Sequence, residues 1–324
     1  MPSLKLSTLS ALAAIVCAAL FAGLPAVAAE APAKVPVFAE GRVLGDARAP
    51  VTLQAYLSFG CPHCIDWYAE VFPELKRRFI DTGKVRLVIV EMAAGHAHLA
   101  QAGAVAARCA PKDKYFTVAD ALFHTRPKLL KGPADKDDYD QQLLDTDAWA
   151  EEAVGKTGID MTAWRACDKA AGLAAFRARM DRAIEQYPGY EGGTPVFLFN
   201  GEPGEGGTPD WLDYSISHAS KAAGKPLTTA DTYDLFCAGG LTPAGGGQAQ
   251  VFEQRWSRKG ALWRLTRGGP EDKGAPAVME AGAQVLSDGT RAYLLDAKND
   301  LKLTGGDGQT LDASCAQIAA TPFP

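Results

Sequence analysis

Apolar positions in the first third of the chain change from the period of a strand to the period of a helix and back. Residues 51–57 form a β-prone run that stops at Ser58, and residues 85–90 form a nearly continuous apolar run, typical of a strand buried on both faces. Pro73 lies between the two runs and is expected to kink the helix there. Five apolar residues, at intervals of three and four, would share one buried face of that helix: Ile65, Tyr68, Phe72, Leu75 and Phe79. The pattern predicts a strand, helix, strand unit.

Helical periodicity then continues from about residue 97 to residue 187, interrupted where proline or glycine occurs. This stretch predicts an all-helical insertion. Strand character returns at residues 195–199, and residues 210–223 can form a closing helix. Residues 43–225 are therefore expected to form one α/β domain that contains the insertion.

Beyond residue 229 the helical periodicity disappears. Asp288-Gly289 is expected to form a hairpin turn between two of the strands that follow. Short runs with the alternation of strands occur at residues 250–256, 261–266, 284–286 and 291–295. The predicted fold class is α/β with an all-helical insertion, followed by a small all-β domain at residues 230–324.

The N-terminus has the three-part layout of a secretory signal peptide. Residues 1–28 carry only one charge, Lys5, and contain an apolar run at residues 9–24 that ends in proline and small residues. A membrane anchor is the alternative, but the apolar run is shorter than the roughly 20 residues that a spanning helix requires. We expect cleavage after Ala28, a tether at residues 29–42 and an exported mature protein that does not span a membrane.

The composition is that of an acidic globular protein. The 324 residues include 33 Lys and Arg against 38 Asp and Glu, giving a net charge of -5, and 47% of them are apolar. This apolar fraction indicates one large or two ordinary globular domains and excludes disorder. The acidic balance and the lack of a basic run argue against nucleic acid as a partner.

Cysteine usage indicates disulfides. Seven cysteines are present, and Cys17 would leave with the signal peptide. An even number then remains, which favours disulfide bonds in an exported chain. If the neighbouring Cys61 and Cys64 pair with each other, the other four cysteines allow three pairings.

We expect structural disulfides between Cys109 and Cys167 and between Cys237 and Cys315. The first pair would join different helical segments, and closing a loop of that length would stabilise the fold by roughly 4 kcal/mol. The second pair brackets the predicted β domain, whose small core would otherwise be marginal. A second redox pair that relays electrons is the alternative for Cys109 and Cys167.

The tetrapeptide Cys61-Pro62-His63-Cys64 follows the first strand and opens the amphipathic helix. The first sulfur would lie where unsatisfied backbone N–H groups and the positive end of the helix dipole favour a thiolate. Pro62 suits the first helical turn, and the His63 imidazole can favour the anion further. The pattern predicts a redox-active disulfide with no organic cofactor and no metal, in which Cys61 attacks and Cys64 resolves.

Two other interpretations of this tetrapeptide remain open. Cys61, His63 and Cys64 could bind zinc or copper, since thiolate and imidazole suit both metals, although no second CxxC completes a four-ligand structural site. The two sulfurs could also form an inert structural disulfide.

Together these features resemble the DsbA-like branch of the thioredoxin superfamily over residues 43–223. The matching motifs are Leu44-Gly45-Asp46, Phe59-Gly60 before the cysteine pair, the helical insertion, and Gly193-Thr194-Pro195 before a strand. The resemblance implies a thioredoxin fold with a cis-proline loop that faces the cysteines, and Pro195 matches that proline. It also implies that the backbone at Thr194 contacts an extended substrate peptide.

The sequence contains features of both disulfide oxidases and disulfide isomerases. A stabilised thiolate makes the oxidised form a better oxidant, and the Cys-Pro-His-Cys motif resembles that of oxidases. Thr194 before the proline is instead similar to periplasmic disulfide isomerases. The acidic residue that relatives bury in the first strand is replaced by Ala55, so proton transfer would rely on solvent, Glu91 or another group.

The sequence therefore predicts a periplasmic thiol:disulfide oxidoreductase. It would act as an oxidase on exported cysteine-containing proteins and would be reset by a membrane redox partner. An isomerase or reductase of the same fold is one alternative. Another is a periplasmic binding protein that acts through the C-terminal β domain and uses the thioredoxin unit as a scaffold.

Overall fold

The computed structural model describes residues 34–125, 139–228, 233–259, 262–267, 278–280, 283–287, 292–296, 300–304 and 308–320. The signal peptide expected at residues 1–28 lies outside this part of the chain. None of the helices described in it combines the length and the apolar character needed to cross a bilayer. The described residues from Val35 onward belong to one compact unit of the chain, Val35–Pro324.

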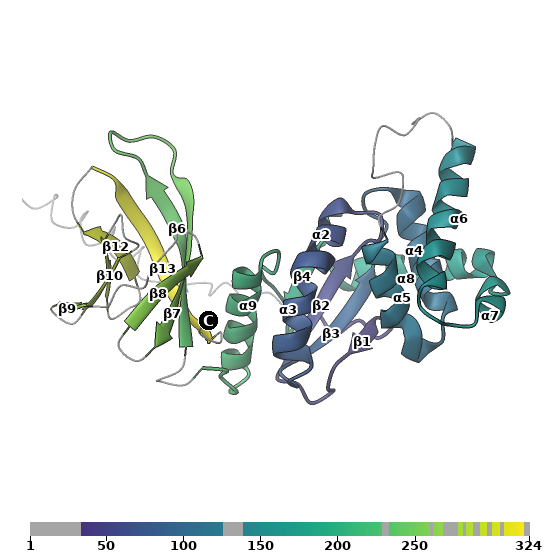
Figure 1. Ribbon diagram of the computed structural model, residues 1–324, viewed down its shortest axis with the longest axis horizontal. Helices are drawn as coiled ribbons and strands as arrows, with labels where there is room; N and C mark the ends of the chain where they lie inside the picture. The colour runs from purple at the N-terminus through teal and green to yellow at the C-terminus, as the bar shows by residue number, and fades with distance from the viewer. Residues whose placement is uncertain are drawn as a thin grey trace, which may run out of the picture. The chain divides into compact units, whose positions relative to one another are not determined.

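A five-stranded sheet carries the first part of the fold (Figure 1). In spatial order its strands are β1 (Arg42–Leu44), β3 (Val85–Glu91), β2 (Val51–Leu57), β4 (Val196–Phe199) and β5 (Glu202–Pro203). β2 and β3 run parallel, with Val51 opposite Val85, whereas β4 runs antiparallel to β2. Most residues of β2 and β3 are buried, as their apolar sequences predict.

The helix predicted between β2 and β3 is present but divided. α2 (Pro62–Glu70) is followed by α3 (Phe72–Leu75) and by a π-helical turn, η1 (Lys76–Ile80). Pro73 lies in the first turn of α3, where its missing N–H leaves no hydrogen bond to the preceding turn, so α2 ends before it as expected. The five apolar positions of the predicted helical face are all buried: Ile65, Tyr68, Phe72, Leu75 and Phe79.

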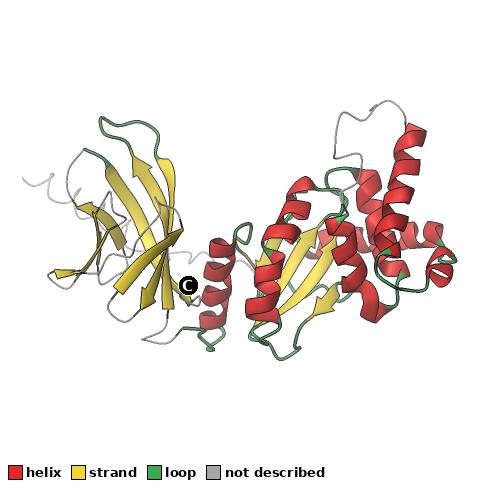
Figure 2. Ribbon diagram, viewed as in Figure 1, coloured by secondary structure: helices red, strands yellow, loops and turns green. Residues whose placement is uncertain are grey.

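Between β3 and β4 the chain forms the predicted helical insertion (Figure 2). Asp160 and Asp168 cap two of its helices by accepting backbone N–H groups of the first turn. A disulfide joins Cys109 at the end of the first helix to Cys167 just before the last, with the Cα atoms 5.8 Å apart. The helices are α4 (Ala97–Cys109), η2 (Lys112–Lys114), α5 (Tyr115–His124), α6 (Tyr139–Gly155), α7 (Met161–Arg165) and α8 (Lys169–Gln186).

The closing helix, α9 (Pro209–Ala222), follows β5. Thr208 is its N-cap, and the Thr208 hydroxyl accepts the backbone N–H of Trp211. Leu212 and Ile216 of α9 are buried in the same apolar core as β2 and α2. α9 therefore has one face packed against the central sheet.

Residues 233–320 contain an eight-stranded antiparallel sheet, which confirms the all-β character predicted there. The predicted turn at Asp288-Gly289 lies outside the described residues, between two strands that do pair as a hairpin would. In spatial order the strands are β8 (Leu262–Arg267), β7 (Gln250–Lys259), β6 (Tyr233–Thr242), β13 (Thr310–Ala319), β12 (Asp300–Thr304), β11 (Ala292–Leu295), β10 (Ala283–Ser287) and β9 (Val278–Glu280).

A disulfide and a small apolar core hold this second sheet. Cys237 in β6 lies opposite Cys315 in β13, and the two are bonded. Trp256 and Tyr293 are fully buried beside them, with their rings nearly perpendicular. Trp256 is therefore a core residue and not part of an exposed binding face.

Candidate active site

The cysteine tetrapeptide lies at the junction of β2 and α2. β2 ends at Leu57, a short turn follows, and Cys61 is the N-cap of α2 with an extended backbone. Pro62 occupies the first helical turn, where its missing N–H costs no hydrogen bond. The Cys61 side chain is thus placed at the end of α2 where free backbone N–H groups converge.

The loop before α4 packs tightly against this turn. His96 N–H donates to the Gly60 carbonyl oxygen at 2.9 Å. A Cβ atom on Gly60 would lie 2.1 Å from the His96 carbonyl oxygen, and a Cβ on Gly95 would lie 2.3 Å from the Gly60 oxygen. Only glycine fits at either position, so direct contact between two backbone segments fixes the turn that precedes Cys61.

Cys61 is the acidic member of the pair. Hydrogen bonds from the Cys64 thiol and from Thr194, together with backbone N–H groups of α2, outweigh burial and lower the pKa of Cys61 to about 5. One of those N–H groups belongs to His63, whose side chain is exposed. Cys61 is largely buried and keeps 6% of its surface exposed.

Cys64 has the opposite character. It has no exposed surface, and its Sγ accepts the Ser58 backbone N–H at 3.4 Å. Burial, together with the neighbouring Cys61, raises the pKa of Cys64 well above its ordinary value. Both cysteines are free thiols in the structure. At neutral pH the pair is therefore one thiolate and one thiol.

A cis peptide bond between Thr194 and Pro195 lies next to the Cys61 sulfur. Cys61 Sγ lies 3.3 Å from the Thr194 carbonyl oxygen, which accepts a hydrogen bond from the sulfur when Cys61 is protonated. Pro195 directly precedes β4, where Val196 lies opposite Tyr56 of β2. Pairing of β2 with β4 thus brings Cys61 and Thr194 together, although they lie 133 residues apart in the sequence.

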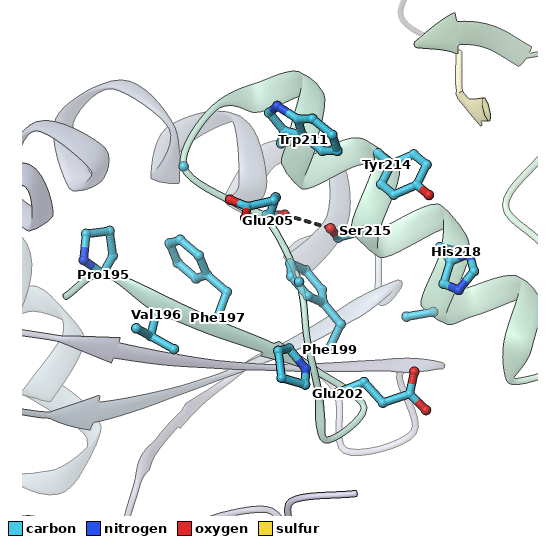
Figure 3. Close-up of a pocket in the computed structure, with 14 residues that line it drawn as sticks. Pro195, Val196, Phe197, Phe199, Glu202, Glu205, Trp211, Tyr214, Ser215 and His218 are labelled. Carbon is cyan, nitrogen blue, oxygen red and sulfur yellow. Dashed lines mark hydrogen bonds between the residues drawn. The ribbon is translucent and has the colours of Figure 1, made fainter. Parts of the chain in front are cut away.

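A cavity of about 660 Å³ opens beside Pro195 (Figure 3). Two acidic residues, Glu202 and Glu205, are among those that line it. Four aromatic residues from β4 and α9 contribute to its walls: Phe197, Phe199, Trp211 and Tyr214. The volume and the aromatic lining of the cavity fit a bulky apolar side chain beside Pro195.

Two hydrogen bonds fix the loop on one side of this cavity. Trp67 Nε1 donates to the Gly206 carbonyl oxygen at 2.7 Å, and Ser215 Oγ donates to the Glu205 carbonyl oxygen at 2.6 Å (Figure 3). The sequence analysis did not find this cavity, because its residues come from a strand, a loop and a helix that only the tertiary fold brings together.

Comparison with known proteins gives the family. A family model described as thioredoxin matches residues 39–211. The chain belongs to this thioredoxin family. A putative protein-disulfide oxidoreductase of Rickettsia prowazekii is 30% identical over 188 residues, which are 57% of this chain and 61% of that protein. A probable disulfide bond formation protein D of Bacillus cereus is 31% identical over 87 residues, 26% of this chain and 40% of that protein. The chain spans less than two thirds of the length of these relatives.

Solved structures are similar over the same region. BdbD from Bacillus subtilis is 20% identical with a TM-score of 0.45, and the match covers 56% of this chain and 93% of that one. Alpha-DsbA1 of Wolbachia pipientis is also 20% identical with a TM-score of 0.45, covering 58% and 94% of the two chains.

Ala55, which replaces the acidic residue discussed in the sequence analysis, is fully buried in β2. The chain therefore has no carboxylate at this position. Glu91, considered above as a substitute, is buried at the end of β3 and bound by the Arg108 guanidinium of α4, with two contacts of 2.7 Å. Among the hydrogen bonds and ion pairs of the described residues, none joins Glu91 to either cysteine. Glu91 therefore has a structural partner elsewhere.

Tyr190 lies close to the cysteines, and sequence analysis did not single it out. Burial, followed by the charges of Cys64 and Cys61, raises the pKa of Tyr190 to about 12. Tyr190 stacks on Tyr56, whose pKa burial also raises to about 12, with 5.7 Å between ring centroids. Both phenols stay neutral at physiological pH, so they add no negative charge that would oppose the Cys61 thiolate.

Within the described part of the chain, Cys61, His63 and Cys64 belong to no group of three or more His, Cys, Asp or Glu arranged to hold a metal ion.

Proposed function

We propose that this protein is a thiol:disulfide oxidoreductase that oxidises exported cysteine-containing proteins through Cys61 and Cys64. The observation that carries the proposal is the contrast within the pair. The pKa of Cys61 is lowered to about 5, while burial raises that of Cys64. A low-pKa sulfur leaves readily from a mixed disulfide, and a stabilised thiolate favours the reduced enzyme, so the oxidised enzyme is a strong oxidant.

The reaction starts from the oxidised pair. A substrate thiolate attacks Cys61 Sγ, the bond between the two enzyme sulfurs breaks, and Cys64 leaves and takes up a proton. A second substrate thiolate then attacks the substrate sulfur of the mixed disulfide and releases Cys61 as its thiolate. The substrate loses two electrons and gains a disulfide, and the enzyme gains the two electrons. A membrane redox partner would reoxidise the pair.

Thr194 and Pro195 would hold the substrate during exchange. Their backbone directly precedes β4 and lies against the Cys61 sulfur, so an extended polypeptide could pair with it as an added strand. The cavity beside Pro195 would take a bulky apolar side chain of the same polypeptide. Pro62 and His63 would contribute by starting α2 and, for His63, by its backbone N–H.

The remaining assignments follow the sequence. We propose export through the signal peptide at residues 1–28, a periplasmic location, a catalytic domain at residues 43–225, and a separate β domain at residues 230–324. The bonded pairs Cys109–Cys167 and Cys237–Cys315 would be structural.

The test of this function is the reduction potential of the Cys61/Cys64 pair, measured against glutathione in the mature protein. We expect a potential well above that of thioredoxin, which is about -270 mV, and closer to the about -120 mV of strong oxidants. The protein should also oxidise a reduced test protein, and Cys61→Ser should abolish this. A potential near the thioredoxin value would refute the oxidase assignment.

Isomerase activity is a second candidate because Thr194, which precedes the cis-proline and lies against Cys61, resembles the corresponding residue of isomerases. Reactivation of a test protein with scrambled disulfides, measured beside oxidation of the same protein in reduced form, separates the two. An oxidase is fast only in the second assay.

A further inference from the structure

Helix α9 lines the cavity and also contacts the strands that begin at residue 233. Trp211, Tyr214 and His218 line the cavity beside Pro195. Asp210, Asp213 and Ser217 occupy a neighbouring face of the same helix and hydrogen-bond to residues of β7 and β13. The spacings of three and four residues within each set keep the two faces distinct along the helix.

Buried ion pairs fix one of these faces. Arg255 of β7 is 6% exposed, and its guanidinium contacts Asp210 at 3.0 Å and Asp234 of β6 at 2.9 Å. It also contacts Asp213 at 2.5 Å, and Asp213 in turn binds Arg78 of η1 at 2.7 Å. Separating charges at this depth would leave carboxylates buried without their partners, so α9 is held firmly against β6 and β7.

The aromatic residues on the other face are held by the same two strands. Trp211 Nε1 donates to the Glu253 carboxylate of β7 at 2.8 Å. The Trp211 ring meets the buried Phe236 ring of β6 at 5.0 Å between centroids, nearly perpendicular, and Tyr214 lies 6.4 Å from Phe236. Figure 3 shows Trp211 and Tyr214 on α9 beside the cavity that Phe197 of β4 also lines. The wall of the cavity that Trp211 and Tyr214 form is thus contacted by residues of β6 and β7.

We propose that Glu253 and Phe236 are positioning residues that set substrate selectivity by fixing Trp211 and Tyr214 as a wall of the cavity. The substrates favoured would be extended polypeptides with a bulky apolar side chain next to the reactive cysteine. This inference rests on the proposed function. It gives the β strands after residue 233, which lie beyond the family match at residues 39–211, a part in recognition. Neither positioning residue lines the cavity itself.

The test compares Glu253→Leu, which cannot accept the Trp211 N–H, with Glu253→Gln, which keeps an acceptor oxygen. Two peptides with the same pair of cysteines are used, one with Phe and one with Ser beside the reactive cysteine, and oxidised glutathione is supplied to reoxidise the enzyme after each turnover. For Glu253→Leu we expect KM for the Phe peptide to rise about five- to tenfold with kcat unchanged, as for loss of one hydrogen bond and some packing. Glu253→Gln should stay within about twofold of the parent protein.

Three measurements make the result specific to positioning. Oxidation of dithiothreitol, which does not fill the cavity, and the Cys61/Cys64 potential should not change in Glu253→Leu. Glu185→Leu, which removes an exposed carboxylate of α8, should behave like the parent protein. Phe236→Leu should raise KM for the Phe peptide in the same way, and thermal unfolding shows whether each variant is folded.

The inference is overturned if Glu253→Leu and Phe236→Leu, both folded, bind and turn over the Phe peptide as the parent protein does. It is also overturned if the Ser peptide or dithiothreitol is affected equally. Binding of a Phe peptide with Ser in place of its cysteines separates this inference from the proposed function. If the parent protein oxidises nothing but binds this peptide more tightly than Glu253→Leu does, the oxidase proposal fails and the positioning role stands.

Discussion

Gly95 and Gly83 share an unusual backbone conformation but have different surroundings. Their φ angles are +74° and +71°, in the region where glycine is favoured. A Cβ on Gly95 would lie 2.3 Å from the Gly60 carbonyl oxygen, whereas nothing lies within 4 Å of the same position on Gly83. The two positions therefore have similar backbone strain, and only Gly95 packs against the turn that carries Cys61.

We expect Gly95→Ala to lower the free energy of unfolding by about 1–3 kcal/mol more than Gly83→Ala, because the added methyl group must displace the active-site turn. The displaced turn should also raise the pKa of Cys61 by weakening its hydrogen bonds. Urea unfolding and cysteine alkylation measure the two effects. Equal losses of stability in the two variants would show that the contact with Gly60 is not restrictive.

At this scale the sequence was most informative where chemistry depends on neighbours along the chain. The spacing of Cys61 and Cys64 at a strand-to-helix junction indicated the pair of cysteines that we propose to be reactive. It did not show that Glu91 is bound by Arg108, because that ion pair joins β3 to α4 and no local pattern encodes it.

Among the secondary-structure elements, the disulfide between Cys109 and Cys167 links the end of α4 to the segment just before α8. These helices pack against each other, and the bond closes a loop with a sequence separation of 58 residues. It lies in the helical insertion, away from the turn that carries Cys61. A purely structural bond of this kind acts on stability and leaves the reactive pair unchanged.

Replacing both residues, Cys109→Ala with Cys167→Ala, should lower the free energy of unfolding by up to about 4 kcal/mol, because the unfolded chain regains the entropy of the open loop. The Cys61/Cys64 potential should stay the same. Urea unfolding and glutathione titration provide the two measurements. A changed potential with unchanged stability would instead favour the alternative of a second redox pair.

The periodicity of apolar residues predicted most elements because it reflects which face of each is buried. It located β2, β3 and the helices of the insertion, and Pro73 marked the end of α2. The cavity beside Pro195 could not be predicted in this way. Its lining combines β4, the loop after β5 and α9, whose proximity depends on long-range strand pairing.

On the scale of the whole molecule, the buried ion pairs of Arg255 connect helix α9, which packs against the five-stranded sheet, to strands β6 and β7 of the eight-stranded sheet. Arg255 lies 42 residues from Asp213 and 45 from Asp210 along the chain, so neither charge pattern nor spacing in the sequence pointed to the cluster. The sequence did predict a second, all-β region, because alternation replaces helical periodicity there.

Arg255→Met should lower the free energy of unfolding by about 3–5 kcal/mol, since it removes a buried guanidinium from Asp210 and Asp234 and leaves Asp213 with Arg78 alone. We also expect one unfolding transition in the parent protein and two in this variant, with the β strands from residue 233 onward unfolding first. Calorimetry can show both. As a control, Lys76→Met removes an exposed ion pair with Asp81 and should cost less than about 1 kcal/mol. Similar small losses in both variants would contradict a docking role for Arg255.

The most direct test is the rate of Cys61 alkylation in the reduced mature protein, measured across a pH series with peptide mapping to separate it from Cys64. Only the thiolate reacts, so a lowered pKa means that the rate is high at neutral pH and falls as the pH drops through the pKa. The account predicts a midpoint near pH 5. A midpoint at about pH 8.5, the pKa of an ordinary cysteine, would contradict it.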